Sequence, residues 1–138
     1  MIVKKDLSLT AHISNLHIFL DQMEEDMLTQ GVDYSKSINV SVACEEIFTN
    51  ICSYAYQKDN EEMMISYEIT NDEAIQIIFI DSGIAFNPLE YKEPDISQSA
   101  DERKIGGLGI FIVKNSMDEL NYSRIDGKNI FTIKKYFK

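Results

Sequence analysis

The chain has 138 residues, 44% of them hydrophobic, and its 23 acidic against 13 basic residues give a formal net charge of −10. This length and apolar content suit a single domain with a real core over residues 1–138. A chain this acidic is repelled by a polyphosphate backbone, which argues against direct nucleic-acid binding and favours a protein partner with a basic surface. No run approaches the roughly 20 apolar residues of a membrane helix, so we expect no membrane association.

The spacing of the two cysteines indicates in which cellular compartment the protein is expected. Cys44 and Cys52 fall on one expected helix. At a rise of 1.5 Å per residue they are about 12 Å apart, beyond the roughly 7 Å limit for a disulfide. We therefore expect core thiols in a reducing environment and a cytoplasmic protein.

The spacing of apolar residues predicts the order of helices and strands. Steps of three and four are typical of a buried helix face, and a period of two is typical of a half-buried strand. In chain order we expect a strand over 2–9, helices over 13–30 and 34–56, strands over 63–70 and 73–81, a helix over 108–119, and strands over 120–125 and 129–137. The last two strands form a hairpin that turns at Asp126 and Gly127.

Tight turns join neighbouring strands in this order, and the helices lie elsewhere. That arrangement predicts an α/β two-layer sandwich of the α+β class, with a mostly antiparallel, mixed sheet and helices on one face. The buried face of the first helix is expected at Ile13, Leu16, Leu20, Met23 and Met27. Residues 87–105 show no periodicity, and a loop of this length in a compact domain is typical of a lid or a binding loop.

Glu46 and Asn50 lie one turn apart on the second expected helix. Rotation by 100° per residue from Ile47, at the centre of the buried stripe, places both on one flank between core and solvent. A lone Glu there is ordinarily a solvated helix edge. Asn is a poor residue for a helix interior, so its presence asks for an explanation. Together they offer a general base and a neutral oxygen ligand for Mg²⁺.

Asp81 follows a strand whose residues 75, 77 and 79 are apolar and face inward. An ordinary interpretation is a turn residue. By parity, however, Asp81 also points toward the helix layer, where an unpartnered carboxylate would cost several kcal/mol. The exocyclic amine of adenine is one donor that would satisfy it. Gly83 then permits close approach of a ligand.

Glycines cluster before the last helix, at Gly106, Gly107 and Gly109 around Leu108. The ordinary interpretation is a flexible loop that enters a buried helix. The functional one is a phosphate-binding turn at a helix N-terminus, with Arg103 and Lys104 adding positive charge. In this order, the three motifs predict a pocket for a purine nucleotide with metal-bound phosphates.

The three motifs and the closing hairpin resemble those of the anti-sigma factor serine kinases, a branch of the histidine-kinase-like ATPase (GHKL) superfamily. The resemblance covers essentially the whole chain and is carried by CEEIFTNICSYAY (44–56), DSGIAFNP (81–88), GGLGIFIVKNSMDEL (106–120) and DGKNIFTIKKYF (126–137). It implies the Bergerat ATPase fold, with Glu46 as general base, Asn50 as Mg²⁺ ligand and Asp81 as acceptor for the adenine amine. The nucleotide-binding residues that it implies are Asn50, Asp81, Gly83, Phe86, Arg103, Gly106, Gly107, Leu108 and Gly109.

By this resemblance the chain is expected to bind ATP and Mg²⁺. It would phosphorylate a serine on a STAS-type anti-sigma antagonist protein, sequester a sigma factor and form a homodimer. The alternative is a nucleotide-dependent protein-binding switch with weak or no kinase activity. The catalytic domain of a sensor histidine kinase is a third interpretation, but the first helix lacks the phosphoacceptor pattern of His followed by an acidic residue and Pro.

Overall fold

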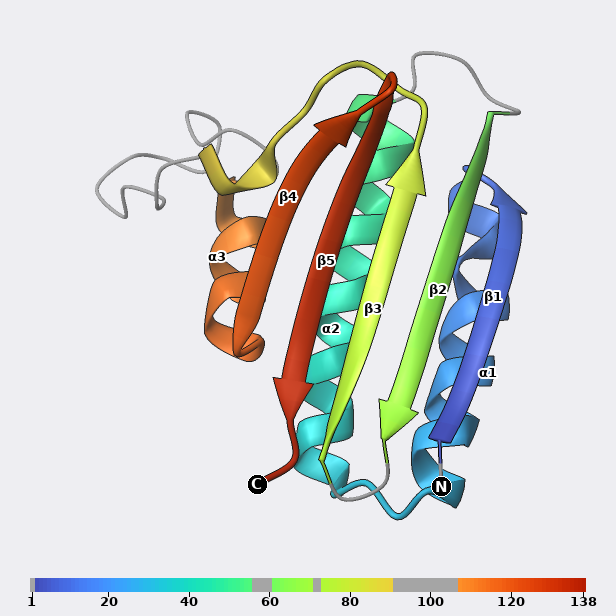
Figure 1. The fold of residues 1–138 in the computed structure, drawn as a ribbon, viewed down its shortest axis with the longest axis vertical. Coiled ribbons are helices and arrows are strands. Elements are labelled where there is room, and N and C mark those ends of the chain that lie inside the picture. The colour runs from blue at the N-terminus through green and yellow to red at the C-terminus, as the bar shows by residue number, and fades with distance from the viewer. Residues whose placement is uncertain (1, 56–60, 71–72, 91–106) are drawn as a thin grey trace.

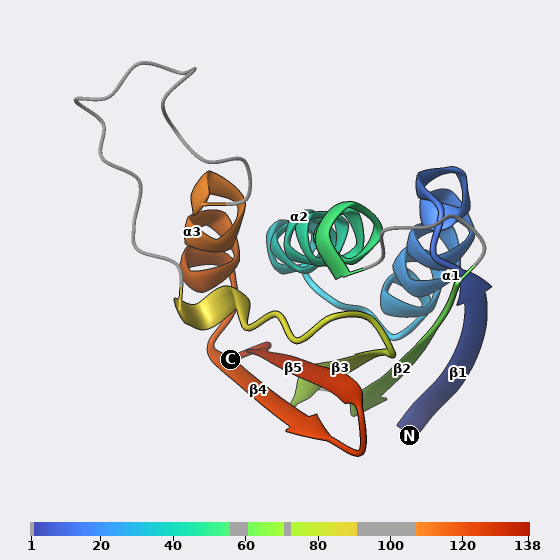
Figure 2. The same ribbon diagram turned by 90° about the horizontal axis from the view of Figure 1, so that it is seen from above.

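The computed structural model describes residues 2–55, 61–70, 73–90 and 107–138 of the chain. Arg103, Gly106 and most of the predicted lid therefore lie outside the described residues. The described segments form two layers, a sheet and a layer of helices (Figures 1 and 2). Within these segments, no helix has both the length and the apolar character needed to cross a lipid bilayer.

Among the described residues, five strands make one sheet in the spatial order β1-β2-β3-β5-β4, and all four neighbouring pairs are antiparallel. Their bounds are β1 (Ile2–Thr10), β2 (Glu62–Thr70), β3 (Ala74–Asp81), β4 (Glu119–Ile125) and β5 (Lys128–Tyr136). The predicted α+β class and the order of elements are confirmed. The sheet is more regular than predicted, because every described pair is antiparallel where a mixed sheet was expected.

The helices cover one face of this sheet, with α2 over its middle, α1 beside β1 and β2, and α3 beside β4 (Figure 2). Their bounds are α1 (Leu16–Thr29), α2 (Tyr34–Asn50) and α3 (Gly107–Ser116). Short turns flank them: a 3-10 turn before α1 (Ile13–Asn15), a π turn after α2 (Ile51–Ala55) and a 3-10 turn after β3 (Pro88–Glu90). The second predicted helix is thus confirmed, although its last turn is wound more loosely than an α-helix.

The core between the layers is organised around Phe19 of α1. Its ring stacks on Phe48 of α2 with centroids 6.4 Å apart, and it meets Phe79 of β3 edge-on at 5.8 Å. Tyr67 of β2 also contacts the Phe19 ring and donates from its hydroxyl to Oδ2 of Asp26 at 2.6 Å. These contacts fix α1 and α2 against β2 and β3.

The prediction of the buried face of α1 is only partly confirmed. Met23 and Met27 are fully buried as expected. Ile13 is half exposed, because it lies in the 3-10 turn before the helix rather than on its inner face. Phe19 takes the central place instead.

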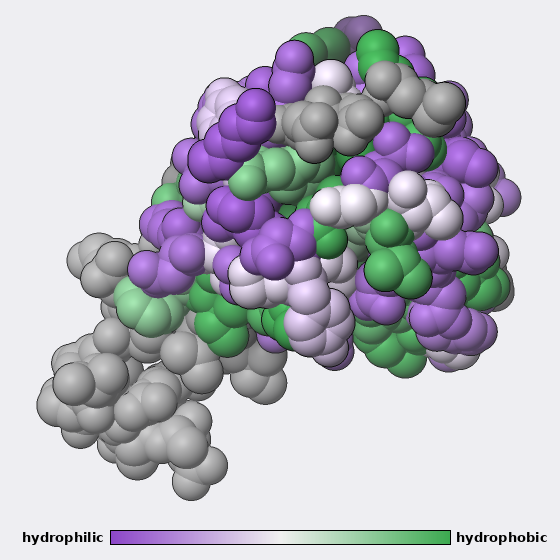
Figure 3. All heavy atoms as spheres, turned by 90° about the horizontal axis from the view of Figure 1, so that it is seen from below, coloured by the Kyte–Doolittle hydropathy of each residue, from purple (hydrophilic) through white to green (hydrophobic). Residues whose placement is uncertain are grey.

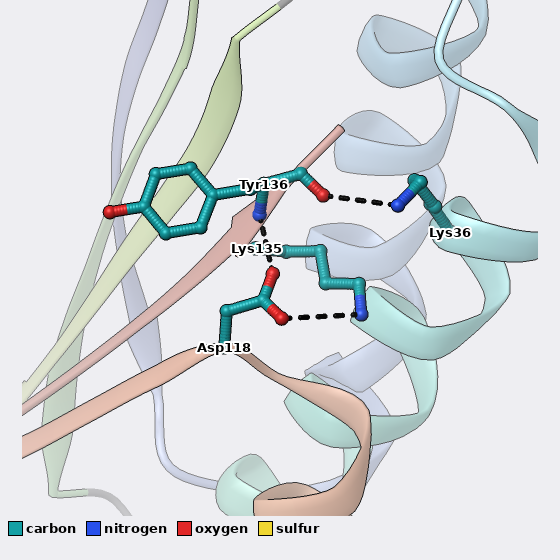
Figure 4. A network of polar contacts seen from close by, with 4 residues as sticks. All are labelled: Lys36, Asp118, Lys135 and Tyr136. Carbon is teal, nitrogen blue, oxygen red and sulfur yellow. Dashed lines mark hydrogen bonds and ion pairs between the residues drawn. The ribbon is translucent and has the colours of Figure 1, made fainter. Parts of the chain in front are cut away.

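At the end of the sheet where α2 begins, a polar network joins helix and strand (Figure 4). Lys36 Nζ donates to the backbone carbonyl of Tyr136 at 3.3 Å, and the Tyr136 N–H donates to Oδ2 of Asp118 at 2.7 Å. Lys135 pairs with the other oxygen of Asp118 at 3.9 Å. Lys36 thereby links the first turn of α2 to the end of β5, and Asp118 links the end of β5 to the segment that precedes β4.

Candidate nucleotide site

The two helical candidates lie at the C-terminal end of α2, next to the first turn of α3. Asn50 is only 6% exposed, and Glu46, one turn earlier, is half-buried. Gly109 faces Glu46 closely, since a Cβ placed on Gly109 would overlap the Glu46 Oε2 and lie 3.2 Å from its Cδ. The prediction that Glu46 and Asn50 share one flank of the helix is consistent with these positions. The glycine lets α3 approach the carboxylate without a clash.

Asp81 is the last residue of β3 and is 4% exposed, so its predicted inward orientation is confirmed. Its Oδ1 accepts hydrogen bonds from Asn129 Nδ2 at 2.8 Å and from the Gly83 N–H at 3.0 Å. A buried carboxylate needs donors, and the protein directs both of these to the same oxygen. The two oxygens of Asp81 are therefore not equivalent.

Asn129 is a site residue that was not predicted from the sequence. It lies at the start of β5, directly opposite Asp81, and is 4% exposed. A signal was present in the sequence: Asn is depleted in strands, and its parity matches that of Phe131 and Ile133, which face inward. The parity that places Asp81 inside therefore applies equally to Asn129.

A narrow hollow of about 20 Å³ brings these residues together from α2, β3, β4 and β5. Among the residues that line it are Asn50, Asp81, Phe86, Tyr122 and Asn129. Such a volume holds about one water molecule. This volume is smaller than a purine ring, so the hollow marks where these side chains converge rather than the full extent of a ligand site.

The remaining predicted residues divide into three groups. Gly83 and Phe86 lie in the segment that follows Asp81, and Phe86 lines the hollow. Gly107 and Leu108 begin α3, as predicted, and Gly109 follows them in its first turn. Arg103 and Gly106 fall outside the described residues. Their roles stay predictions.

Both acidic candidates are harder to ionise than an ordinary carboxyl group. Burial raises the pKa of Asp81, while the hydrogen bonds from Asn129 and Gly83 and the charge of Arg124 oppose that rise. Burial also raises the pKa of Glu46, and the negative charge of Glu45 adds to it. An effective general base at neutral pH has a pKa of about 7, and a raised pKa brings a carboxylate closer to that value.

The surroundings of Asn50 show whether the site suits a metal ion bound to a nucleotide. Its Nδ2 is buried and has no hydrogen-bond partner among the described residues. A buried polar atom of this kind is rare, and the amide can turn to present either its nitrogen or its oxygen. The described residues include no group of three His, Cys, Asp or Glu side chains that could hold a metal. A cation here would thus depend on phosphate oxygens, waters and one amide, as Mg²⁺ commonly does.

Comparison with known proteins assigns this chain to a class. The model of the histidine kinase-like ATPase domain matches residues 9–135. The chain therefore belongs to the histidine-kinase-like ATPases. Within them it belongs to the family of anti-sigma factor serine kinases, because it is similar over most of its length to several proteins named serine-protein kinase RsbW.

The RsbW of Staphylococcus epidermidis is 32% identical over 114 residues, which cover 78% of this chain and 70% of that protein. The RsbW of Bacillus mycoides strain KBAB4 is 26% identical over 108 residues, or 75% of this chain and 67% of that protein. Among solved structures, that of the RsbU and RsbW domains of Rv1364c from Mycobacterium tuberculosis superposes with a TM-score of 0.68 at 15% identity. That match covers 96% of this chain but about a third (32%) of the other, and it bears on the fold alone.

The contact between Gly109 and Glu46 yields a stability prediction. In the wild-type background, Gly109→Ala should lower the free energy of unfolding by about 1 kcal/mol, because the new methyl group forces the Glu46 side chain away. In a Glu46→Ala background the loss should disappear, since Ala is the better helix former. Urea denaturation of the four proteins measures the coupling.

Gly127→Ala is the matched control for this cycle. Gly127 has a φ of +77°, and no described atom lies within 4 Å of the position that a methyl group would take. Its substitution should therefore destabilise both backgrounds equally, through backbone strain alone. If the effects of Gly109→Ala and Glu46→Ala add within about 0.5 kcal/mol, the two residues are not in energetic contact and the site geometry is wrong.

Proposed function

We propose that the chain is an ATP-dependent protein serine kinase that acts as an anti-sigma regulatory factor. It phosphorylates a serine on a STAS-type antagonist protein and sequesters a sigma factor in the cytoplasm. The observation that carries the proposal is a set of three polar residues near the C-terminal end of α2. Asp81 of β3 has one oxygen held by two donors, and Asn50 has a buried amide nitrogen without a partner among the described residues. Glu46 lies one turn before Asn50 and is half-buried. Family membership supports the same interpretation.

Asp81 is proposed to recognise the base. Its Oδ2 accepts an N–H from the exocyclic amine of adenine, while Oδ1 stays bound to Asn129 and Gly83. Guanine presents an oxygen at the same ring position, so two acceptors would face each other. The buried position of Asp81 makes that mismatch costly, because water cannot easily reach the unpaired oxygen.

Asn50 and the first turn of α3 are proposed to face the phosphates. Asn50 would hold Mg²⁺ through its amide oxygen, and the N-terminus of α3 offers backbone N–H groups to an anion. When bound, ATP supplies the phosphoryl group and Mg²⁺ neutralises the charge on its phosphates. Gly109 keeps this end of α3 free of a side chain that would displace Glu46.

Glu46 is proposed to be the general base. It takes the proton from the serine hydroxyl of the partner protein, which makes the oxygen a better nucleophile. Its raised pKa fits this role, and its half-buried position lets a hydroxyl from another protein reach it. The negative charge of the neighbouring Glu45 helps to keep the proton on Glu46 once it has been transferred.

The partners are proposed from surface chemistry and family. Large apolar side chains are exposed on β1 and α1, among them Ile2, Ile18 and Leu28, the last at 77%. At the end of the molecule seen in Figure 3, hydrophobic residues lie among hydrophilic ones. The exposed apolar side chains on β1 and α1 support assembly into a homodimer. The net charge of −10 favours partners with basic surfaces.

Adenine recognition is tested with Asp81→Ala. Loss of a charged hydrogen bond, worth about 1.5–3 kcal/mol, should weaken ATP binding by roughly 10- to 150-fold. Calorimetry on the wild type should also show much weaker binding of GTP than of ATP. Equal affinity for the two purines, or no effect of the substitution, would contradict the assignment of Asp81.

Phosphoryl transfer is tested with Glu46→Gln. Transfer of radiolabel from ATP to a co-purified partner should fall by about 10²- to 10⁴-fold, while Mg-ATP binding stays nearly unchanged. Asn50→Ala should instead weaken the Mg²⁺-dependent part of binding. Since the pKa of Glu46 is raised, wild-type transfer should decline on acidification at a higher pH than an ordinary carboxyl group would give.

Glu45→Gln is the matched control, because Glu45 is the exposed neighbour of the base. It should retain transfer and move the acid limb of the pH profile to lower pH, since it removes a charge that raises the Glu46 pKa. Wild-type protein that binds Mg-ATP but never labels a cognate partner would instead identify the chain as a nucleotide-dependent switch.

Self-association is tested by light scattering at micromolar protein. A dimer returns twice the 15.8 kDa of one chain. Leu28→Asp places a charge on the exposed face of α1 and should shift the protein toward the monomer. Ile125→Asp is the control, because Ile125 is also exposed (54%) but lies on β4 at the other edge of the sheet. A wild type that remains at 15.8 kDa excludes the homodimer under these conditions.

A further inference from the structure

The side-chain amide of Asn129 is fully engaged. Its Nδ2 donates to Asp81 Oδ1 and to the backbone carbonyl of Ile84, each at 2.8 Å. Its Oδ1 accepts from the Tyr122 hydroxyl at 2.5 Å, from Arg124 Nη1 at 3.0 Å and from the Phe86 N–H at 3.3 Å. The partners fix which way the amide points, because a flip would set its oxygen against two acceptors.

This amide helps to fix the orientation of the Asp81 carboxylate, and so the direction in which its other oxygen points. Oδ1 is shared between Asn129 and the Gly83 N–H, so rotation of the carboxylate would break both bonds. Oδ2 is then the oxygen that can meet a donor from a nucleotide base. Register alone does not achieve this, since the strand pairing places the two residues opposite each other but leaves the carboxylate free to turn.

The same amide also holds the wall of the hollow. Ile84 and Phe86 are both bonded to it through their backbone, and Arg124 Nη1 bridges from its Oδ1 to the carbonyl of Gly83 at 2.8 Å. Phe86 lines the hollow. One buried side chain on β5 thus couples the orientation of Asp81 to the position of the segment that lines the hollow.

We propose that Asn129 is a positioning residue that determines purine specificity. Acting through Asp81, it presents one carboxylate oxygen to the position where a 6-amino purine carries a donor, and it holds residues 83–86 so that the base cannot shift to avoid a mismatch. A 6-oxo purine is rejected because neither the carboxylate nor the wall can adapt. The inference rests on the proposed binding of adenine nucleotide.

The test compares ATP with ITP, which carries an oxygen in place of the amine at C6. Calorimetry with the full chain should show that the wild type prefers ATP by at least about tenfold. Asn129→Leu removes every bond of the amide at similar size. It should bring the ATP to ITP ratio close to one, while the Mg²⁺ dependence of the remaining binding, which belongs to Asn50, persists.

Asn129→Asp gives a second readout that a purely structural role would not produce. Near neutral pH its new carboxylate repels Asp81, so ATP binding should be weak. On acidification the pair shares a proton, and the new O–H can donate to Asp81. ATP binding by this variant should therefore strengthen as the pH falls, whereas binding by the wild type should weaken once Asp81 is protonated. The other described ionisable groups bonded to this position are Tyr122 and Arg124.

Tyr122→Phe covers the case in which Asn129→Leu does not fold. It removes one hydrogen bond to the Asn129 oxygen and leaves the two donors to Asp81, Asn129 Nδ2 and the Gly83 N–H, in place. We expect a partial fall in the ATP to ITP ratio, and Asn121→Leu on the exposed face of β4 should leave the ratio unchanged.

The outcomes separate the two claims. If the wild type discriminates but folded Asn129→Leu discriminates equally well, or if Asn129→Asp keeps the wild-type pH dependence, the role of Asn129 is overturned and the proposed function stands. If the wild type does not distinguish ATP from ITP, both adenine recognition and this inference fall.

Discussion

The pairing of β3 with β5 places Asp81 opposite Asn129, and the site depends on the hydrogen bond between their side chains. A carboxylate at 4% exposure is destabilised unless donors surround it, and here the donors come from the neighbouring strand and from the turn that follows. The same bonds oppose the rise in the Asp81 pKa that burial causes. The carboxylate is therefore held in one orientation, with its two oxygens in different surroundings.

Helix α2 connects this base-binding end to the proposed chemistry. Its Phe48 ring stacks on Phe19, which holds the C-terminal part of the helix against the core. That part of the helix carries Glu46 and Asn50, and the absence of a side chain at Gly109 leaves room for the Glu46 carboxylate beside α3. The end of α2 thus positions the residues proposed for chemistry, beside the strand pair that positions Asp81.

Much of this arrangement could be predicted from the sequence, because it follows from periodicity. The parity of residues 75, 77 and 79 placed Asp81 inside, and the helical period placed Glu46 and Asn50 on one flank. Asn129 is not predicted as a site residue, because the turn and the apolar residues that identify the hairpin leave open which way its polar side chains point. The first helix begins later than predicted, at Leu16, because Ile13 lies in the 3-10 turn that precedes it.

The bonds that make the site specific could not be predicted from periodicity alone. The orientation of the Asp81 carboxylate depends on the paths of the Gly83 backbone and of β5, which are known only in three dimensions. The absence of a partner for Asn50 Nδ2 among the described residues likewise depends on how α2 packs against its neighbours. The predicted roles of Arg103 and Gly106 concern residues outside the described segments.

The most direct test of the central claim is a nuclear magnetic resonance titration of ¹⁵N-labelled protein with Mg-ATP, observed at the Asn50 side-chain amide and the Gly83 backbone N–H. If α2 and β3 form one nucleotide site, both signals should shift and saturate at the same nucleotide concentration, and the Asn50 shift should shrink when Mg²⁺ is withdrawn. Saturating shifts confined to other parts of the chain, with Asn50 and Gly83 unmoved, would contradict the account.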